Sequence, residues 1–235
     1  HILLGPFTGQ ALGDMGADVI KVEAPEGDFY RNVGTKRHKG MSAQWLNCNR
    51  NKRSISIDLK TDAGREILGR LLRDADVFIH NMRPRAVARL GFDYQSVKAL
   101  NPGIVYCFSS GYGQDGPYRD YPAFDDIIQA RSGLAAVNGA NDGQPRLTPI
   151  PITDLATSQN LTQAVLAGLY HKAKTGEGCH VEVPMFETFV NLVMNQHLGA
   201  HAFQPPTDPA GYPRMLSPFR KPCRTADGFI VHGVY

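Results

Sequence analysis

Apolar residues occur along the chain in two alternating patterns. Short segments that are apolar throughout, or apolar at every second position, are typical of strands. They lie within residues 17–22, 54–59, 76–80, 104–109 and 181–183. Longer stretches with an apolar residue every three or four positions predict helices, and they lie within residues 6–15, 61–72, 84–90, 93–100, 124–137, 155–173 and 185–202. Because strands and helices alternate, we predict an α/β fold, with a mainly parallel sheet and helices on both faces.

Other segments depart from these patterns. His1 to Leu4 resemble the end of a strand, and with no initiator Met they indicate a fragment of a longer chain. Residues 29–53 are polar and irregular, so we expect a long surface loop with some helix. Residues 111–123 are rich in Gly, Pro and Asp, which predicts a second loop.

The composition changes near residue 203, which indicates a domain boundary. Residues 204–222 are rich in proline, as an extended linker is. The residues that follow Asp227 resemble the start of a hairpin whose partner strand is absent. We therefore predict a large α/β domain over residues 1–203, a linker over 204–225 and the start of a truncated small domain over 226–235.

The overall composition is that of an ordinary globular protein, with 42% hydrophobic and 20% charged residues. The net charge of +3 comes from cations spread along the chain, which argues against a nucleic-acid-binding surface. The four cysteines are widely spaced and form no C-x-x-C pair, so we expect a reducing, cytoplasmic setting. No apolar run approaches the roughly 20 residues that span a bilayer, and we expect a soluble protein without a membrane partner.

Two motifs resemble known sites without meeting their requirements. Gly111 to Gly116 match G-x-G-x-x-G, but Pro117 continues the loop where a dinucleotide-binding site needs a helix N-terminus. His197 and His201 have the spacing of metal ligands on a helix, but no third ligand is evident and the Glu of H-E-x-x-H is missing. We therefore predict neither a dinucleotide nor a metal. The sequence also has no G-x-S-x-G elbow for a hydrolase triad.

Asp154 lies between a Pro-rich segment and the longest predicted helix. Its simplest interpretation is an N-cap whose carboxylate accepts hydrogen bonds from backbone N–H groups. The same position would keep the carboxylate ionised and direct it toward the loop-lined end of the sheet, where α/β proteins bind ligands. Asp154 is therefore a candidate for helix capping and for nucleophilic chemistry.

Further motifs follow one another along almost the whole chain. They are GP (5–6), LGDMGADVIKVE (12–23), NKRS (51–54), DLK (58–60), N (81), RLG (89–91), GYGQ (111–114), GP (116–117), FD (124–125) and KTGEG (174–178). In this order they resemble the class III CoA-transferases, the family of formyl-CoA:oxalate and carnitine CoA-transferases that also includes α-methylacyl-CoA racemases. The resemblance implies a Rossmann-like large domain within an interlocked two-domain fold.

The resemblance implies transfer of coenzyme A from an acyl-CoA to a small carboxylic acid, with Asp154 at the position of the family's nucleophile. In the family this aspartate forms an acyl anhydride and then an aspartyl-CoA thioester. Coenzyme A takes part as substrate, and no permanently bound cofactor or metal is implied. The resemblance also implies an interlocked homodimer and, in some members, a glycine-rich loop that would lie beyond Tyr235.

The family's CoA contacts fall here on Leu3, Leu4, Ile57, Asp58, Lys60, Asn81, Met82, Arg89, Phe124 and Asp125. Lys60 and Arg89 are the candidates for phosphate binding, because a cation beside a phosphate makes charge-assisted hydrogen bonds. Their alternative interpretation is a solvated helix end. Formyl-CoA transferase has Gln-Ala in place of Leu3 and Leu4 and Arg in place of Ala24, so contacts near these positions must differ.

The type of residue at position 124, which is Phe in this chain, distinguishes two activities of the family. The racemases have a His here that exchanges the substrate's α-proton together with the aspartate, and a phenyl ring cannot transfer a proton. We therefore favour CoA transfer, with α-methylacyl-CoA racemisation as the alternative. A third interpretation is a catalytically silent CoA-binding or dimerisation fragment. The sequence does not specify the acyl donor, the acceptor or the pathway.

Overall fold

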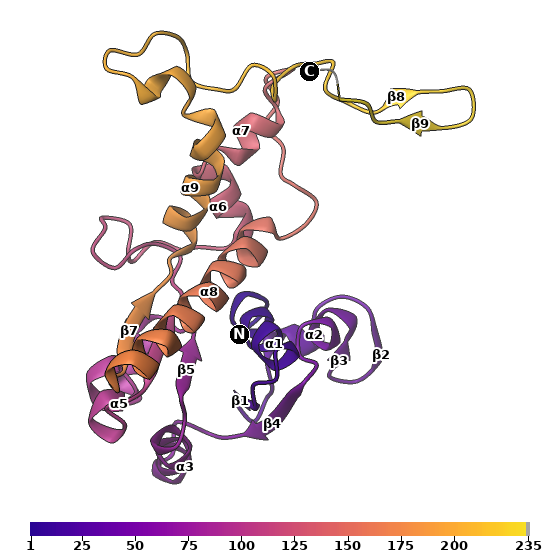
Figure 1. Cartoon of the computed structure of the whole chain (residues 1–235). Coiled ribbons are helices and arrows are strands. Elements are labelled where there is room, and N and C mark those ends of the chain that lie inside the picture. The colour runs from indigo at the N-terminus through magenta and orange to yellow at the C-terminus, as the bar shows by residue number, and fades with distance from the viewer. Residues whose placement is uncertain (234–235) are drawn as a thin grey trace.

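The structure is a computed structural model that describes residues 1–233. Its parallel strands are β1 (Val19–Glu23), β4 (Lys52–Ser56), β5 (Val77–His80), β6 (Val105–Phe108) and β7 (Cys179–Glu182). β1 pairs with β4, and β5, β6 and β7 form a sheet in that order, with every pairing parallel (Figure 1). The predicted α/β class is confirmed, and the parallel pairing is divided between these two sheets.

The helices agree with the predicted pattern in order and type. They are α1 (Leu4–Asp14), α2 (Ala43–Asn47), α3 (Asp62–Arg73), α4 (Pro84–Arg89), α5 (Tyr94–Leu100), α6 (Asp125–Arg131), α7 (Leu134–Asn138), α8 (Ile152–Thr175) and α9 (Met185–His197), with 3-10 turns η1 (Phe29–Asn32) and η2 (Gly199–Ala202). The strand predicted at His1 to Leu4 is wrong, because Ile2 has φ +61° and α1 begins at Leu4. The predicted helix 124–137 is divided at Gly133, whose φ of +88° does not fit a right-handed helix.

The core is organised around β6, whose residues are all buried. Side chains of successive strand residues point to opposite faces. Val105 and Cys107 therefore pack in one cluster with Leu161 of α8, whereas Tyr106 and Phe108 belong to a second cluster with residues of α3, α4 and α5. Helices thus cover both faces of this sheet, as predicted.

The segment predicted as a surface loop contains more structure than its sequence suggested. It forms η1, an antiparallel pair of β2 (Lys36–His38) and β3 (Met41–Ser42), and the helix α2. Two ion pairs hold this segment against β1: Glu23 contacts Arg31 at 2.6 Å and Lys21 contacts Asp28 at 2.7 Å. These contacts fix η1, which contributes a residue to the candidate site.

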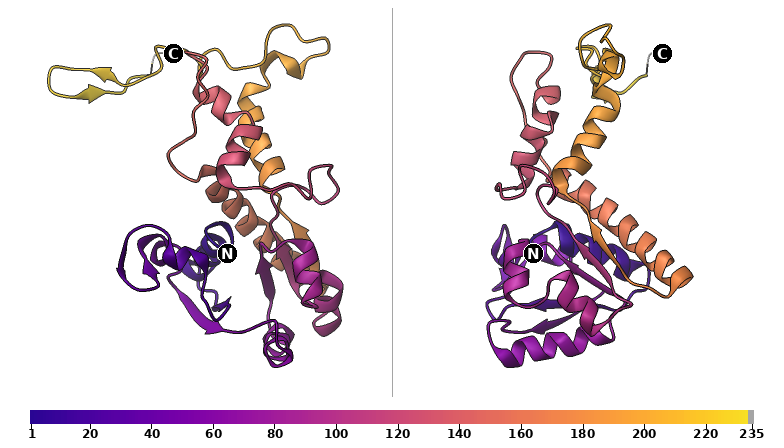
Figure 2. Two further views of the ribbon diagram at one scale, coloured as in Figure 1. Left: turned by 180° about the vertical axis from the view of Figure 1, so that it is seen from behind. Right: turned by 90° about the vertical axis from the view of Figure 1, so that its left-hand side faces the viewer.

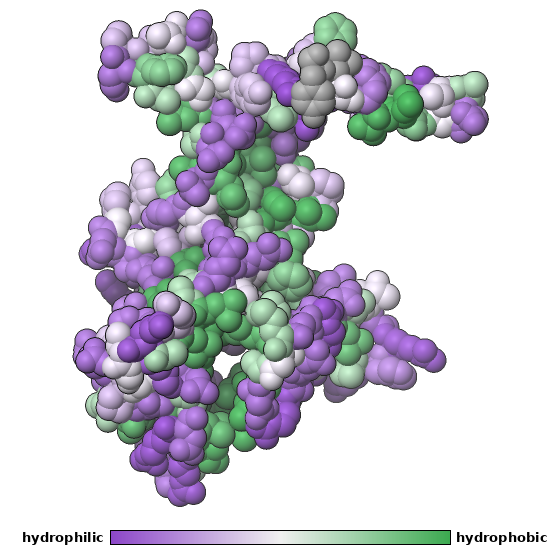
Figure 3. Space-filling view, viewed as in Figure 1, coloured by the Kyte–Doolittle hydropathy of each residue, from purple (hydrophilic) through white to green (hydrophobic). Residues whose placement is uncertain are grey.

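The C-terminal segment ends in a hairpin of β8 (Cys223–Arg224) and β9 (Phe229–Ile230). The predicted absence of a partner strand is wrong, because β8 lies inside the predicted linker. Helices α6 to α9 separate this hairpin from the parallel sheets (Figures 1 and 2). The hairpin exposes hydrophobic residues (Figure 3). Phe229 of β9 is 72% exposed.

The predicted domain boundaries stay predictions, and residues 234–235 of the proposed small domain lie outside the described residues. Within residues 1–233, no helix combines the length and the apolar character needed to cross a membrane.

Candidate active site

Asp154 lies in the first turn of α8, but it is not the helix cap. The N-cap position is occupied by Pro151, which corrects the predicted capping role of Asp154. The backbone N–H groups of Thr153 and Asp154 instead donate to Oδ1 of Asp125, at 2.7 Å and 3.0 Å. A carboxylate from α6 therefore caps α8.

The Asp125 carboxylate has hydrogen-bond donors at both oxygens. Its Oδ1 also accepts from Thr153 Oγ1 at 2.7 Å, and its Oδ2 accepts from Gln129 Nε2 at 2.6 Å. A negative charge at this position is favoured by the dipole of α8 and by the charge-assisted hydrogen bonds. The CoA contact predicted for Asp125 stays a prediction, and the structure assigns its carboxylate a capping role.

The Asp154 carboxyl group is in a different environment. It is partly buried, and none of the hydrogen bonds within residues 1–233 ends on its oxygens. Burial, together with the negative charge of Asp125, raises the pKa of Asp154 from 3.8 to about 7. The expectation that the helix start would keep this group ionised at lower pH is wrong, because Asp125 accepts the capping hydrogen bonds.

This arrangement gives Asp154 suitable chemistry for covalent catalysis. A carboxylate of raised pKa is more basic than an ordinary one, and it is still largely ionised just above neutral pH. Since no donor within residues 1–233 occupies its oxygens, they are available to an electrophilic carbon. The nearby Asp125 contributes negative charge, and its own oxygens accept hydrogen bonds from Thr153, Asp154 and Gln129.

Tyr30 of η1 is a neighbour that the sequence analysis missed. Burial is the main cause of its raised pKa, with further contributions from the charges of Cys48 and Asp154. The phenol therefore lies within electrostatic range of the Asp154 carboxyl. Its backbone is fixed by Ser42 Oγ, which donates to Tyr30 O at 2.6 Å. No motif marked Tyr30, because it lies in the segment interpreted as a surface loop.

Helix α1 brings the predicted N-terminal CoA contacts to the start of α8. Thr8 Oγ1 lies 3.0 Å from Ser158 O and 3.1 Å from Leu4 O. Leu4 and Asp154 are each about one helical turn from this contact, so they lie in the same region. Leu3 and Leu4 are only 8% and 3% exposed, and their contact with CoA stays a prediction.

Other predicted CoA residues follow the carboxyl ends of parallel strands, the usual ligand-binding edge of α/β folds. Ile57 and Asp58 follow β4, and Asn81 and Met82 follow β5. Asn81 Nδ2 donates to His1 O at 3.1 Å, which places it beside the start of α1. Ile57 is buried, so its side chain is part of the core.

The remaining predicted contacts are exposed. Lys60 follows Asp58, whose Oδ1 accepts the Lys60 backbone N–H at 2.9 Å, and Arg89 Nε donates to Arg85 O at 3.2 Å. Phe124 is 64% exposed and precedes Asp125 at the start of α6. Within residues 1–233 no hydrogen bond or ion pair joins Lys60 to Arg89, and the CoA contacts of all these residues stay predictions.

The two motifs set aside in the sequence do not join this site. The loop that contains Gly111 does not open a helix, since α6 begins only at Asp125. His197 ends α9 whereas His201 belongs to η2, so the two do not share one helix. In residues 1–233, no cluster of His, Cys, Asp or Glu is suited to hold a metal.

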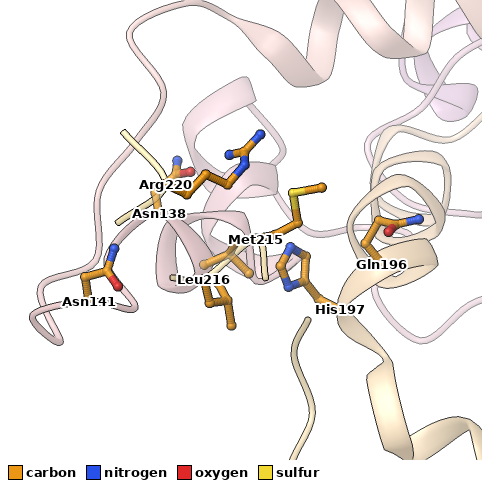
Figure 4. A pocket seen from close by; sticks show the side chains of 8 residues that line it. Asn138, Asn141, Gln196, His197, Met215, Leu216 and Arg220 are labelled. Atoms are coloured by element: carbon orange, nitrogen blue, oxygen red, sulfur yellow. The ribbon is translucent and has the colours of Figure 1, made fainter. Parts of the chain in front are cut away.

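A separate cavity of about 370 Å³ lies between the ends of α7 and α9 and the C-terminal segment (Figure 4). It is lined by Val137, Asn138, Asn141, Gln196, His197, Met215, Leu216 and Arg220. Within residues 1–233, none of these lining residues forms a hydrogen bond with Asp154 or Asp125. The cavity is therefore distinct from the candidate active site.

Known proteins resemble this chain over its whole length. The family model for CoA-transferase family III matches residues 1–235. The succinate–glutarate CoA-transferase of Agrobacterium fabrum is 38% identical over 242 residues, covering 100% of this chain and 60% of that protein. The formyl-CoA:oxalate CoA-transferase of Streptomyces avermitilis is 40% identical over 192 residues, covering 82% of this chain and 47% of that protein.

Solved structures show the same fold. A CAIB/BAIF family protein from Brucella suis has a TM-score of 0.87 and 34% identity, covering 97% of this chain and 62% of that one. Rv3272 from Mycobacterium tuberculosis has a TM-score of 0.84 and 32% identity, covering 100% of this chain and 62% of that one. The chain thus spans less than two thirds of these relatives. Because the family model matches every residue and the fold agrees, this chain belongs to CoA-transferase family III.

Proposed function

We propose that the protein transfers coenzyme A from an acyl-CoA donor to a carboxylic acid, with Asp154 as the covalent nucleophile. The main observation is the Asp154 carboxyl at the start of α8, which has a raised pKa and whose oxygens accept no hydrogen bond from the described residues. The names of the relatives support a small acid as acceptor, since they specify succinate, glutarate and oxalate.

The first half of the reaction would load CoA onto the enzyme. The ionised Asp154 carboxylate attacks the thioester carbonyl carbon, the C–S bond breaks, and CoA leaves as a thiolate, which gives an acyl–aspartyl anhydride. The thiolate then attacks the aspartyl carbon of that anhydride. This forms an aspartyl-CoA thioester and releases the donor acid as its carboxylate.

The second half of the reaction transfers CoA from Asp154 to the acceptor acid, by the reverse sequence of bond changes. Its carboxylate attacks the aspartyl thioester carbon and expels CoA thiolate, which gives a new anhydride. The thiolate attacks the acceptor's acyl carbon, forming the new acyl-CoA and regenerating the Asp154 carboxylate. Each intermediate is an anhydride or thioester, so the energy of the donor thioester is retained and each step avoids direct acyl exchange.

The same proposal covers partners and location. We propose an interlocked homodimer, as the family resemblance implies, and a cytoplasmic location, which the wide spacing of the cysteines supports. We propose no permanently bound cofactor and no metal in the reaction, because carboxylate and thiolate perform each bond exchange. We propose that CoA binds at the residues the family resemblance implies, which are Leu3, Leu4, Ile57, Asp58, Lys60, Asn81, Met82, Arg89, Phe124 and Asp125.

One experiment tests the reaction class and its racemase alternative together. The intact protein is incubated in deuterated water with pairs of an acyl-CoA, including a chiral 2-methylacyl-CoA, and a dicarboxylic acid. We expect a new CoA ester by mass spectrometry and retention of configuration, because Phe124 cannot transfer a proton. Rapid α-deuterium uptake would contradict this and point to Asp125 as a second base. If the protein shows no α-deuterium exchange and no CoA transfer, the result would favour the catalytically silent alternative.

A second prediction concerns the CoA phosphates. Arg89→Ala should raise the KM for acyl-CoA by about tenfold and change kcat much less, because a charge-assisted hydrogen bond made equally in ground and transition states contributes uniform binding. Lys60→Ala should behave in the same way. Steady-state kinetics and calorimetry with CoA at low salt measure both effects.

Arg73→Ala is the matched control for the Arg89 variant. Arg73 is an exposed arginine in the last turn of α3, so its substitution removes the same charge without a predicted phosphate contact. We expect wild-type affinity for CoA in this control. If Arg89→Ala and Arg73→Ala bind CoA with equal affinity, Arg89 does not contact the CoA phosphates.

A further inference from the structure

Gln129 is a polar residue of α6 with 0% exposure. Its Nε2 donates to Asp125 Oδ2 at 2.6 Å and lies 3.4 Å from Ile150 O. Its Oε1 accepts the Thr148 backbone N–H at 2.8 Å. Every polar atom of this buried side chain is thus engaged, as burial of an amide requires.

These contacts join two segments that approach the active site from different directions. Thr148 and Ile150 belong to the segment that leads into α8, and Asp125 lies at the start of α6. The direction of the amide is determined by its partners, since a carboxylate can accept only from Nε2 and a backbone N–H can donate only to Oε1. Gln129 therefore holds the Asp125 carboxylate and the entry to α8 in one geometry.

We propose that Gln129 is a positioning residue for Asp154: it fixes the Asp125 carboxylate across the start of α8 and so fixes the orientation and the charge environment of the reacting carboxyl. The inference rests on the proposed role of Asp154 as nucleophile. It assigns no contact between Gln129 and substrate.

Asp125 is the charged neighbour through which Gln129 can act on Asp154. Tyr30 of η1 also interacts electrostatically with Asp154. It is a neutral phenol near pH 7, because its pKa is raised above 10.0. The other titratable groups on the elements packed against α8 face solvent, have other partners or lie away from Asp154 in the core or the separate cavity. They are Asp14 (with Arg50), Tyr106 (with Phe92), Cys107 and Cys179 (in the core cluster), Asp126 (exposed), Arg131 (on tyrosine rings), His180 (on aromatic rings), Glu182 (with Ser110 and Gln114), Glu187 (with Gly113) and His197 (in the cavity at the end of α9).

Two substitutions of Gln129 separate positioning from simple packing. Gln129→Met keeps the volume but removes the donor to Asp125, and we expect kcat to fall by about 10- to 100-fold with little change in the KM for acyl-CoA. Gln129→Glu keeps the shape, and only its protonated form can donate to Asp125. Its kcat should therefore approach wild type at low pH and fall below wild type progressively as the pH rises.

Gln159→Glu is the matched control, because Gln159 is exposed on α8 and gains the same charge. It should follow the wild-type pH profile. If Gln129→Met does not fold, the isosteric Gln129→Glu decides the question by its pH profile alone. A Gln129→Glu profile that coincides with that of Gln159→Glu would overturn the proposal.

A titration independent of activity distinguishes this inference from the proposed function. Carboxyl-¹³C NMR of aspartate-labelled protein, with Asp154 assigned from Asp154→Asn, should show a wild-type midpoint near pH 7. The midpoint should fall in Gln129→Met. The Asp125 carboxylate is then no longer held next to Asp154 and water can enter, and both changes favour ionisation of Asp154. An unchanged midpoint would overturn the inference, whereas a shifted midpoint in a protein that transfers no CoA would overturn only the proposed function.

Discussion

Asp154→Asn is expected to lower kcat for CoA transfer by at least about 10³-fold, because an essential covalent nucleophile is removed. Asn keeps the size of the side chain and its place in α8, and the backbone N–H of residue 154 can still donate to Asp125. An amide oxygen does not form an anhydride with the acyl group. Intact-mass analysis after quenching should therefore detect acyl and CoA adducts in wild type and none in Asp154→Asn.

The wild-type activity should also depend on the ionisation of this carboxyl. With a pKa of about 7, the reactive carboxylate increases as the pH rises, so kcat/KM should rise through pH 7 and then level off. Asp126→Asn is the matched control, since Asp126 is an exposed acid of the same α6 that carries Asp125. More than a few per cent of wild-type transfer in Asp154→Asn would contradict a covalent role.

Much of the fold could be predicted because its signals are local. The pattern that starts at residue 61 predicted a helix, and Thr61 is its N-cap, with Oγ1 accepting the Gly64 N–H at 3.0 Å. The apolar segment around Val105 was expected to be a strand, and it is the buried central strand of its sheet. A cap needs only residues three positions apart, and a buried strand only a short apolar run, so a single sequence contains both signals.

The errors arise where contacts are distant in sequence or elements are very short. Asp154 was interpreted as a cap because it precedes a helical pattern, but the cap comes from Asp125, 29 positions earlier. No local pattern specifies which of two carboxylates reaches the free N–H groups. The strands β3 and β8 contain two residues each, too few to show an alternation of polar and apolar positions.

The residues of the candidate site also fall into those that the sequence identified and those that it did not. Asp154 and the predicted CoA residues were identified through family motifs, whereas Tyr30 and Gln129 were not. Gln129 lies within an apolar helical stretch, and its sequence neighbours do not reveal that its amide faces Asp125. Its role follows only from the way α6 and the segment before α8 come together.

The same carboxyl should make the protein less stable as the pH rises. The pKa of Asp154 is raised in the fold, from 3.8 to about 7, so below pH 3.8 the group is protonated in both states and has no such effect. Between these values the unfolded chain loses the proton while the folded protein retains it, which lowers the free energy of unfolding progressively. The loss becomes complete and constant about one pH unit above that pKa.

Asp154→Asn removes this titration and should therefore be more stable than wild type at pH 8, by on the order of 3 kcal/mol, with little difference at pH 4. Urea unfolding at a series of pH values measures the gap, and Asp126→Asn, which removes an exposed carboxylate, should show no comparable growth with pH. A gap that does not widen between pH 4 and 7 would contradict the raised pKa. A variant that loses activity yet gains stability above neutral pH is the result expected where function, not folding, requires a buried acid.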